Sequence, residues 1–236
     1  MADRVPDKRV PERRDVRRDE RIGLLIVMCL AALAGAVDAS GLFLLKDLYV
    51  SFMSGNTTSM AAALAKADLP RVRLIAGILL TFVAGAAAGT ALAVLTGRRH
   101  VPVVILAAAA VLVVPVGAAD WSIPAMTFAT GMLNATIHEA GSVQVSITYV
   151  TGTLVKVGRG LGMMLCRQSQ DWTWLRQAVP WVGLLAGAAP TTYAMIHIGH
   201  ATLVALPLTA LLIGTGSWFA LAQAAVEAPA SPPPRL

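Results

Sequence analysis

An acidic residue stands inside an apolar run of this sequence. Asp38 lies about two-thirds of the way along residues 22–45, a run that is otherwise free of charge. A carboxylate at the centre of a membrane helix costs about 3 kcal/mol on insertion scales, so it is expected to face protein or water and to have a partner. Asp38 is therefore either a site for a proton, a cation or a substrate group, or a structural ion-pair or capping group near the membrane interface.

Two clusters of small polar residues follow apolar runs in the two parts of the chain. Helix N-termini offer free N–H groups and a positive dipole end, so two such clusters that face each other can bind an anionic or polar ligand. The alternative is helix capping and close packing, which Ser, Thr and Gly also favour in membranes. The first cluster holds Ser51, Ser54, Gly55, Asn56, Thr57 and Thr58, and the second holds Thr148, Thr151, Gly152 and Thr153.

Two cations follow the second cluster and have no equivalent after the first. Lys156 and Arg159 are three residues apart, which places them on one face of a helix. They are the expected countercharges for Asp38. In the alternative, their aliphatic stems extend along the helix and their charged ends only reach the cytoplasmic interface.

Signatures of enzymes and metal sites are missing from the sequence. It holds no nucleophile elbow, HExxH, phosphate loop or CxxC pattern. Cys29 and Cys166 have neither paired spacing nor a nearby histidine cluster, which argues against a disulfide framework and a zinc site. We therefore expect no enzymatic activity and no cofactor.

The elements that position these residues are apolar helices. The chain is 56% hydrophobic and only 14% charged, against roughly a quarter charged in soluble proteins. A bilayer core needs roughly 20 apolar residues in a helix, which satisfies its own backbone polar groups. Six runs meet this need, at residues 22–45, 74–97, 101–119, 121–138, 178–197 and 201–226. The expected fold is an all-α, polytopic integral membrane bundle, with the bilayer as its main partner.

The polar clusters fall on two shorter segments, residues 49–65 and 145–166. Each can either cross the bilayer with a polar, partly unwound centre or enter as a short helix and return. Hydropathy does not choose between these alternatives.

The two ends of the chain differ from the apolar part. Residues 1–21 hold eight Lys or Arg together with six acids, so we expect an unstructured basic tail in the cytoplasm, and residues 227–236 form a second loose end. Because most other basic residues flank apolar runs, membrane topology explains the net charge of +6 better than a nucleic-acid partner does.

An internal repeat divides the membrane part into residues 22–119 and 120–226. The segment 34–39 matches 130–135, with Asn134 in the place of Asp38, at an offset of 131 − 35 = 96. The segment 54–57 matches 151–154 at an offset of 97. Two GxxxG pairs, Gly85 with Gly89 and Gly183 with Gly187, match at an offset of 98, and we expect these glycines to pack helices closely.

The short segments decide what kind of repeat this is. If they cross, each half has four crossings and the halves are parallel; if they do not, three crossings make the halves inverted, as in many transporters. The positive-inside rule mildly favours eight crossings, which places most of the basic residues between segments inside and makes Arg98 and Arg99 exceptions. With six crossings Arg98 and Arg99 are inside, and Lys66, Arg71 and Arg73 are outside.

Three segments together resemble the YoaK-like family of bacterial membrane proteins, a domain of unknown function. They are Ala34-Gly-Ala-Val-Asp-Ala, Ser54-Gly-Asn-Thr and Thr151-Gly-Thr-Leu. The resemblance covers about residues 22–225 and implies a protein of several helices in the bacterial cytoplasmic membrane. It brings no established reaction. One departure is Ser54, where similar sequences commonly have Thr.

Duplication, polar-centred short segments and an intramembrane Asp38 together predict a small secondary transporter or permease. Its substrate would be small and polar or anionic, with a proton or cation bound at Asp38, and the sequence leaves homo-oligomer formation open. The alternatives are a membrane scaffold or sensor that does not transport, and a channel.

Overall fold

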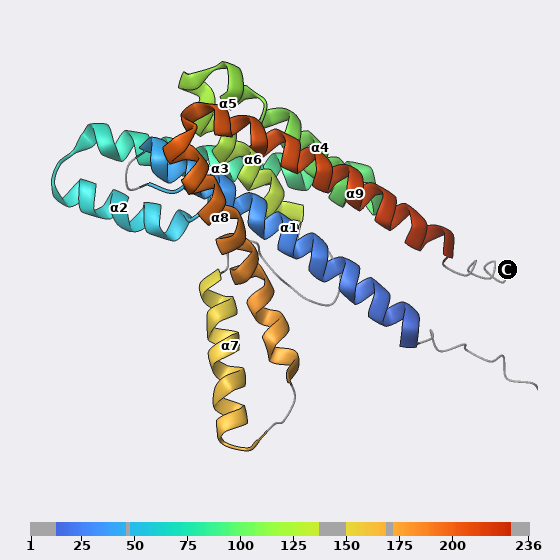
Figure 1. Cartoon of the computed structure of the whole chain (residues 1–236). Helices are drawn as coiled ribbons and strands as arrows, with labels where there is room; N and C mark the ends of the chain where they lie inside the picture. The colour runs from blue at the N-terminus through green and yellow to red at the C-terminus, as the bar shows by residue number, and fades with distance from the viewer. Residues whose placement is uncertain (1–12, 46–47, 137–149, 169–171, 228–236) are drawn as a thin grey trace, which may run out of the picture.

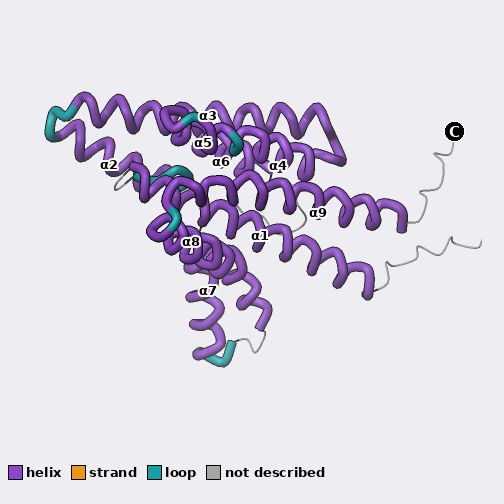
Figure 2. Tube along the Cα trace, turned by 45° about the horizontal axis from the view of Figure 1, so that its top comes forward, coloured by secondary structure: helices purple, strands orange, loops and turns teal. Residues whose placement is uncertain are grey.

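The computed structural model describes residues 13–45, 48–136, 150–168 and 172–227, all of them in helices or short connections (Figure 1). Within these ranges the chain contains no strand (Figure 2). The α-helices of the first half are α1 (Arg13–Leu45), α2 (Met53–Ala65), α3 (Leu69–Thr96), α4 (His100–Val111) and α5 (Val114–Gly117), with 3-10 turns η1 (Gly97–Arg99) and η2 (Ala119–Trp121). Those of the second half are α6 (Ser122–Thr136), α7 (Val150–Leu165), α8 (Val179–His197) and α9 (Ala205–Glu227), with η4 (Trp172–Ala178) and η5 (Gly199–Val204).

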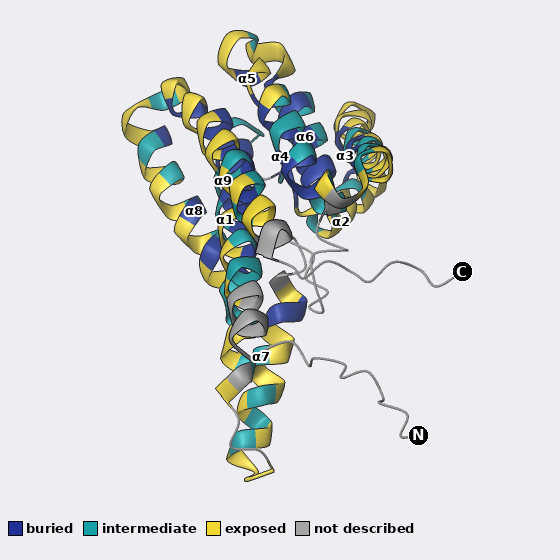
Figure 3. Cartoon of the chain, turned by 90° about the vertical axis from the view of Figure 1, so that its right-hand side faces the viewer, coloured by how far each residue is buried: buried dark blue, intermediate teal, exposed yellow. Residues whose placement is uncertain are grey.

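Five described stretches are long and apolar enough to cross a membrane, so the predicted helical membrane bundle is confirmed. They are Arg21–Leu45, Leu69–Thr96, His100–Gly117, Trp174–His197 and Gly199–Gln223. Their outer faces carry large apolar side chains such as Leu80 and Leu95, which are 70% and 82% exposed (Figure 3). Such a surface suits lipid and not water. The predicted span 121–138 corresponds to α6, and residues 137–149 lie outside the described part.

Two boundaries differ from the prediction. Residues 13–21, expected to be unstructured, are helical as the start of α1, because an apolar helix that has already formed extends at little cost into residues that tolerate helix. The predicted run 101–119 is interrupted after Val111, since Pro115 lacks an N–H group and its ring would clash with the carbonyl four residues earlier. Residues 1–12 and 228–236 of the predicted tails lie outside the described residues.

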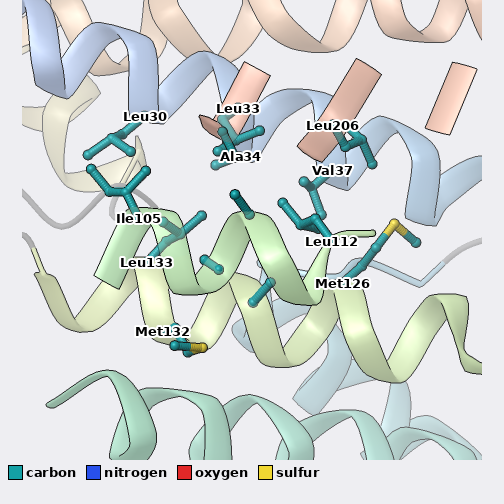
Figure 4. Packing of buried hydrophobic residues seen from close by; sticks show 14 of the residues in the cluster. Leu30, Leu33, Ala34, Val37, Ile105, Leu112, Met126, Met132, Leu133 and Leu206 are labelled. Carbon is teal, nitrogen blue, oxygen red and sulfur yellow. The ribbon is translucent and has the colours of Figure 1, made fainter. Parts of the chain in front are cut away.

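The core lies between α1, α4, α6 and α9. Leu30, Leu33 and Val37 of α1 meet Ile105 of α4 and Met126 of α6, and all five are almost fully buried (Figure 4). Outside this core, α8 lies against α1, and α3 lies against α6.

Glycines allow these two outer helices to approach the core helices closely. A Cβ atom added to Gly183 would come 2.7 Å from the carbonyl oxygen of Met28, and one added to Gly187 would clash with the carbonyl oxygen of Ala32. At the other crossing, added Cβ atoms on Gly85 and Gly89 would meet the carbonyl oxygens of Phe128 and Met132. Each core helix contributes a glycine in return: Gly35 faces α8 and Gly131 faces α3.

The short helices α2 and α7 end in the same backbone motif. After α2, Ala67 has a φ of 55°, its N–H donates to Leu64 O, and the next N–H donates to Ala63 O. After α7, Arg167 has a φ of 56°, its N–H donates to Met164 O, and the next N–H donates to Met163 O. This is the Schellman cap, formed twice with a residue other than glycine in the left-handed conformation.

Replacement of Gly187 by Ala should destabilise the bundle. The added methyl group overlaps the backbone of α1, and overpacking of this kind costs about 1–3 kcal/mol. We expect a lower Tm of the purified protein in detergent. Gly77→Ala is the matched control, because no atom lies within 4 Å of the added Cβ. Equal Tm values for the two variants would contradict the role of close packing at this crossing.

Candidate functional site

Asp38 binds the backbone of the segment that leads into α2. Its carboxylate accepts hydrogen bonds from the N–H groups of Val50, at 3.0 Å, and Ser51, at 2.7 Å, and from the hydroxyl of Ser51. Among the described residues, the hydrogen-bond donors to Asp38 are thus two consecutive residues of one segment. The carboxylate joins the last two turns of α1 to the start of the next element.

This segment needs such a partner because it is not helical. Leu48, Val50 and Ser51 are buried, and α2 begins only at Met53. Backbone N–H groups that leave the helical pattern inside a membrane protein have no water to bind and must find acceptors within the chain. Asp38 supplies that acceptor.

Asn56 holds the same segment from the other side. Its side-chain Oδ1 accepts from the N–H of Tyr49 at 3.0 Å, and its Nδ2 donates to the carbonyl oxygen of Tyr49 at 2.6 Å. The side chain is fully buried. One side-chain amide thereby supplies hydrogen-bond partners for both the N–H and the C=O group of Tyr49, which lies outside any helix.

Two glycines give the segment its room. A Cβ on Gly41 of α1 would clash with the side chain of Val50, and one on Gly55 would come 2.6 Å from the ring of Phe52. That ring packs edge-on against Tyr49, with 5.5 Å between the ring centroids. We call Asp38, Gly41, Tyr49, Val50, Ser51, Phe52, Gly55 and Asn56 the latch.

The remaining residues of the first predicted cluster do not join the latch. Ser54 and Thr57 are exposed, and the hydroxyl of Thr57 donates to Met53 O of its own helix at 2.8 Å. The hydroxyl of Thr58 donates in the same way to Ser54 O. These bonds leave the side chains on the outer face of α2.

In the second half, Asn134 is half-buried on α6 and donates to Thr130 O at 3.0 Å. Thr151 is exposed at the start of α7, whereas Gly152 and Thr153 are buried. Thr148 and the segment that would correspond to residues 49–51 lie outside the described residues.

Lys156 and Arg159 are not brought to Asp38. Both are exposed on α7, and in the described part of the chain no ion pair joins either of them to Asp38. Asp38 is held by backbone N–H groups and a hydroxyl in place of the predicted countercharge. The spacing of the residues could not reveal this, because the donors belong to a backbone whose path depends on the fold.

A proton or a ligand that binds Asp38 would compete with the N–H groups and the hydroxyl that now donate to its carboxylate. A proton on Asp38 would occupy part of the carboxylate that now accepts from Val50 and Ser51, which would weaken the hold on the segment. Among the described residues, no group of three or more His, Cys, Asp or Glu side chains could hold a metal ion.

Fold and latch together define a polytopic helical membrane protein with a carboxylate-bound break between its first two helices. The chain belongs to the family described as a protein of unknown function (DUF1275), whose model matches residues 26–216. It is similar to the UPF0700 transmembrane protein RA0705 of Rhizobium meliloti (strain 1021), with 36% identity over 199 residues that cover 84% of this chain and 87% of the relative. No solved structure matches the chain. The expectation of an uncharacterised membrane family is thus confirmed, and the resemblance to YoaK-like proteins stays a prediction.

The latch predicts where hydrogen exchange depends on Asn56. In an Asn56→Ala protein both backbone polar groups of Tyr49 lose their partner, at a cost of about 1–3 kcal/mol. Amide exchange in residues 48–52 should become faster, as measured by mass spectrometry on the purified protein. Thr57→Val, which changes only an exposed hydroxyl of the same helix, is the control. Unchanged exchange in the Asn56 variant would show that the side chain does not hold this segment.

Proposed function

We propose that the protein is a small secondary transporter or permease of the bacterial cytoplasmic membrane, built from two inverted halves, and that it is not an enzyme. The observation that carries this proposal is the latch: a carboxylate within an apolar span binds an unwound segment, which is followed by a short helix. Broken helices of this kind surround the substrate and ion sites of transporters.

Reciprocal packing supports the duplication. The first helix of each half, α1 or α6, lies against the third helix of the other half, α8 or α3, and both crossings use the paired glycines. The last helices, α4 and α9, lie against each other. The two Schellman caps add a further match, at an offset of 167 − 67 = 100.

Helix length supports three crossings in the first half. At 1.5 Å per residue, the 13 residues of α2 span about 20 Å, less than a bilayer core of about 30 Å. The start of α1 and the end of α9 lie at the same end of the bundle (Figures 1 and 2). At that end Arg99 stacks over the ring of Trp218, 5.2 Å from its centroid. An odd number of crossings per half makes the halves antiparallel.

This topology differs from the one that the positive-inside rule mildly favoured. It places Arg98 and Arg99 in the cytoplasm with the basic N-terminus, and it places Lys66, Arg71 and Arg73 outside. The length of α2 is the stronger argument, because a helix that is about 10 Å too short would leave backbone polar groups in lipid.

In this proposal the substrate is small and polar or anionic, and Asp38 takes a proton or cation in the transport cycle. Uptake of the proton or cation would compete with the N–H groups of Val50 and Ser51 and free the segment before α2. Loss of that hold would couple the charge on Asp38 to movement of α2 relative to α1.

The topology can be tested with single cysteines. In a protein whose Cys29 and Cys166 are replaced by Ser, we introduce Cys at Asp68 or at Arg99. In whole cells a membrane-impermeant thiol reagent should label the first and not the second. The opposite result would support eight crossings and a parallel repeat.

Transport can be tested on proteoliposomes that are exposed to a panel of amino acids, organic acids and sugars, with currents measured on a solid-supported membrane. A solute that evokes a current should do so at least tenfold more weakly in Asp38→Asn and Asn56→Ala proteins, and Thr57→Val should behave as the wild type. Full currents in the Asp38→Asn protein would reject Asp38 as the coupling site. A scaffold or sensor would give no current, and its function in cells would be lost when residues 2–20 are deleted.

A further inference from the structure

The helix α7 carries its cations and its leucines on opposite sides. Lys156 and Arg159 lie on one side, because a position three residues after Lys156 falls within about one sixth of a turn of it at 3.6 residues per turn, and Arg167 follows two residues after the end of the helix. All three are exposed. The opposite side carries three exposed apolar side chains, Leu154, Leu161 and Leu165, while the exposed Val155 lies beside Arg159 and the exposed Met163 beside Lys156.

The position of α7 leaves both sides free. It leaves the bundle at a steep angle to α1 and runs beside η4 and the first part of α8 (Figures 1 and 2). Its contact with η4 is close, because a Cβ on Gly160 would clash with the side chain of Trp174. Trp172 stacks beside Trp174 with 6.2 Å between the ring centroids and is itself exposed. Most of α7 is coloured as exposed or intermediate in Figure 3.

The corresponding helix of the first half lacks this character. The repeat offset of 97 places Ser59 and Ala62 opposite Lys156 and Arg159, and α2 itself contains no charged residue, although Lys66 follows it as Arg167 follows α7. A short helix of this kind therefore forms without cations. The cations of α7 point to a binding partner that α2 does not share.

We propose that α7 lies in the headgroup layer of one leaflet and binds anionic phospholipid through Lys156, Arg159 and Arg167. An amphipathic helix with basic residues on one face and exposed leucines on the other fits this boundary, since its cations meet phosphate while its apolar face enters the acyl chains. Exposed tryptophan such as Trp172 also suits the interface. In the six-crossing topology proposed above, α7 follows the fourth crossing and lies at the cytoplasmic leaflet, whose surface is negative.

The test uses the purified full-length protein in detergent and native mass spectrometry with phosphatidylglycerol or phosphatidylcholine. The wild type should bind phosphatidylglycerol more tightly, and K156Q/R159Q should weaken that binding by about fivefold for each cation removed, with no change for phosphatidylcholine. R71Q/R73Q is the matched control, because it removes two exposed cations from α3. The charge-conserving K156R/R159K protein should bind as the wild type does.

Three results would overturn the proposal. They are equal binding of the two lipids by the wild type, an equal loss in K156Q/R159Q and R71Q/R73Q, and displacement of the lipid by inorganic phosphate at millimolar concentration, which would assign the cations to a free anion. These results are independent of transport: a protein that carries no solute can still bind lipid at α7.

Discussion

Unpaired backbone groups in a bilayer are the constraint on which the rest of this structure depends. A chain that leaves a helix inside lipid must supply partners for every N–H and C=O group that it frees. Two side chains supply these partners for the segment between α1 and α2. Asp38 accepts hydrogen bonds from the N–H groups of Val50 and Ser51, and Asn56 forms hydrogen bonds with both the N–H and the C=O group of Tyr49. Without them the buried segment before α2 would have a high free energy, and α2 would have no fixed place beside α3.

The lipid environment also explains the close packing at the two helix crossings, α1 with α8 and α3 with α6. Helices in lipid gain little from burying apolar surface against each other, so their association depends on close packing. Glycines on both partners allow backbone to meet backbone, as at Gly35 with Leu184 O and Gly187 with Ala32 O. Because each crossing joins a helix of one half to a helix of the other, the two halves cannot be pulled apart without loss of both crossings. A contact of this kind leaves movement to α2, which packs mainly on α3, and to α7, which packs mainly on η4.

Periodicity and composition predicted most of the fold, because a membrane span is a local property of about 20 residues. The run 74–97 is close to α3, and the glycine pairs lie at the crossings that their spacing suggested. Less local features were missed. The extension of α1 back to Arg13 depends on helix propagation, and the end of α4 depends on a proline four residues further along. For the site, the sequence alone singled out Asp38 and placed Asn56 in a polar cluster. One of its two alternatives for Lys156 and Arg159 made them partners of Asp38, whereas the fold supplies backbone donors. Hydrogen bonds to backbone groups cannot be predicted from residue type, because every residue except proline has a backbone N–H group.

The two parts of the chain differ in the charges on their matching helices. A strict repeat would give both halves the same charge on the first helix and the same surface on the short helix, and each conformational state of the proposed transporter would then have a two-fold-related equivalent of equal energy. This chain keeps a carboxylate in α1 where α6 has the neutral Asn134, and it puts cations on α7 where α2 has none. In the transporter proposed above, a proton or cation would therefore act on one half, while anionic lipid would hold α7 of the other half at one leaflet. The two end states of the transport cycle would then differ in free energy.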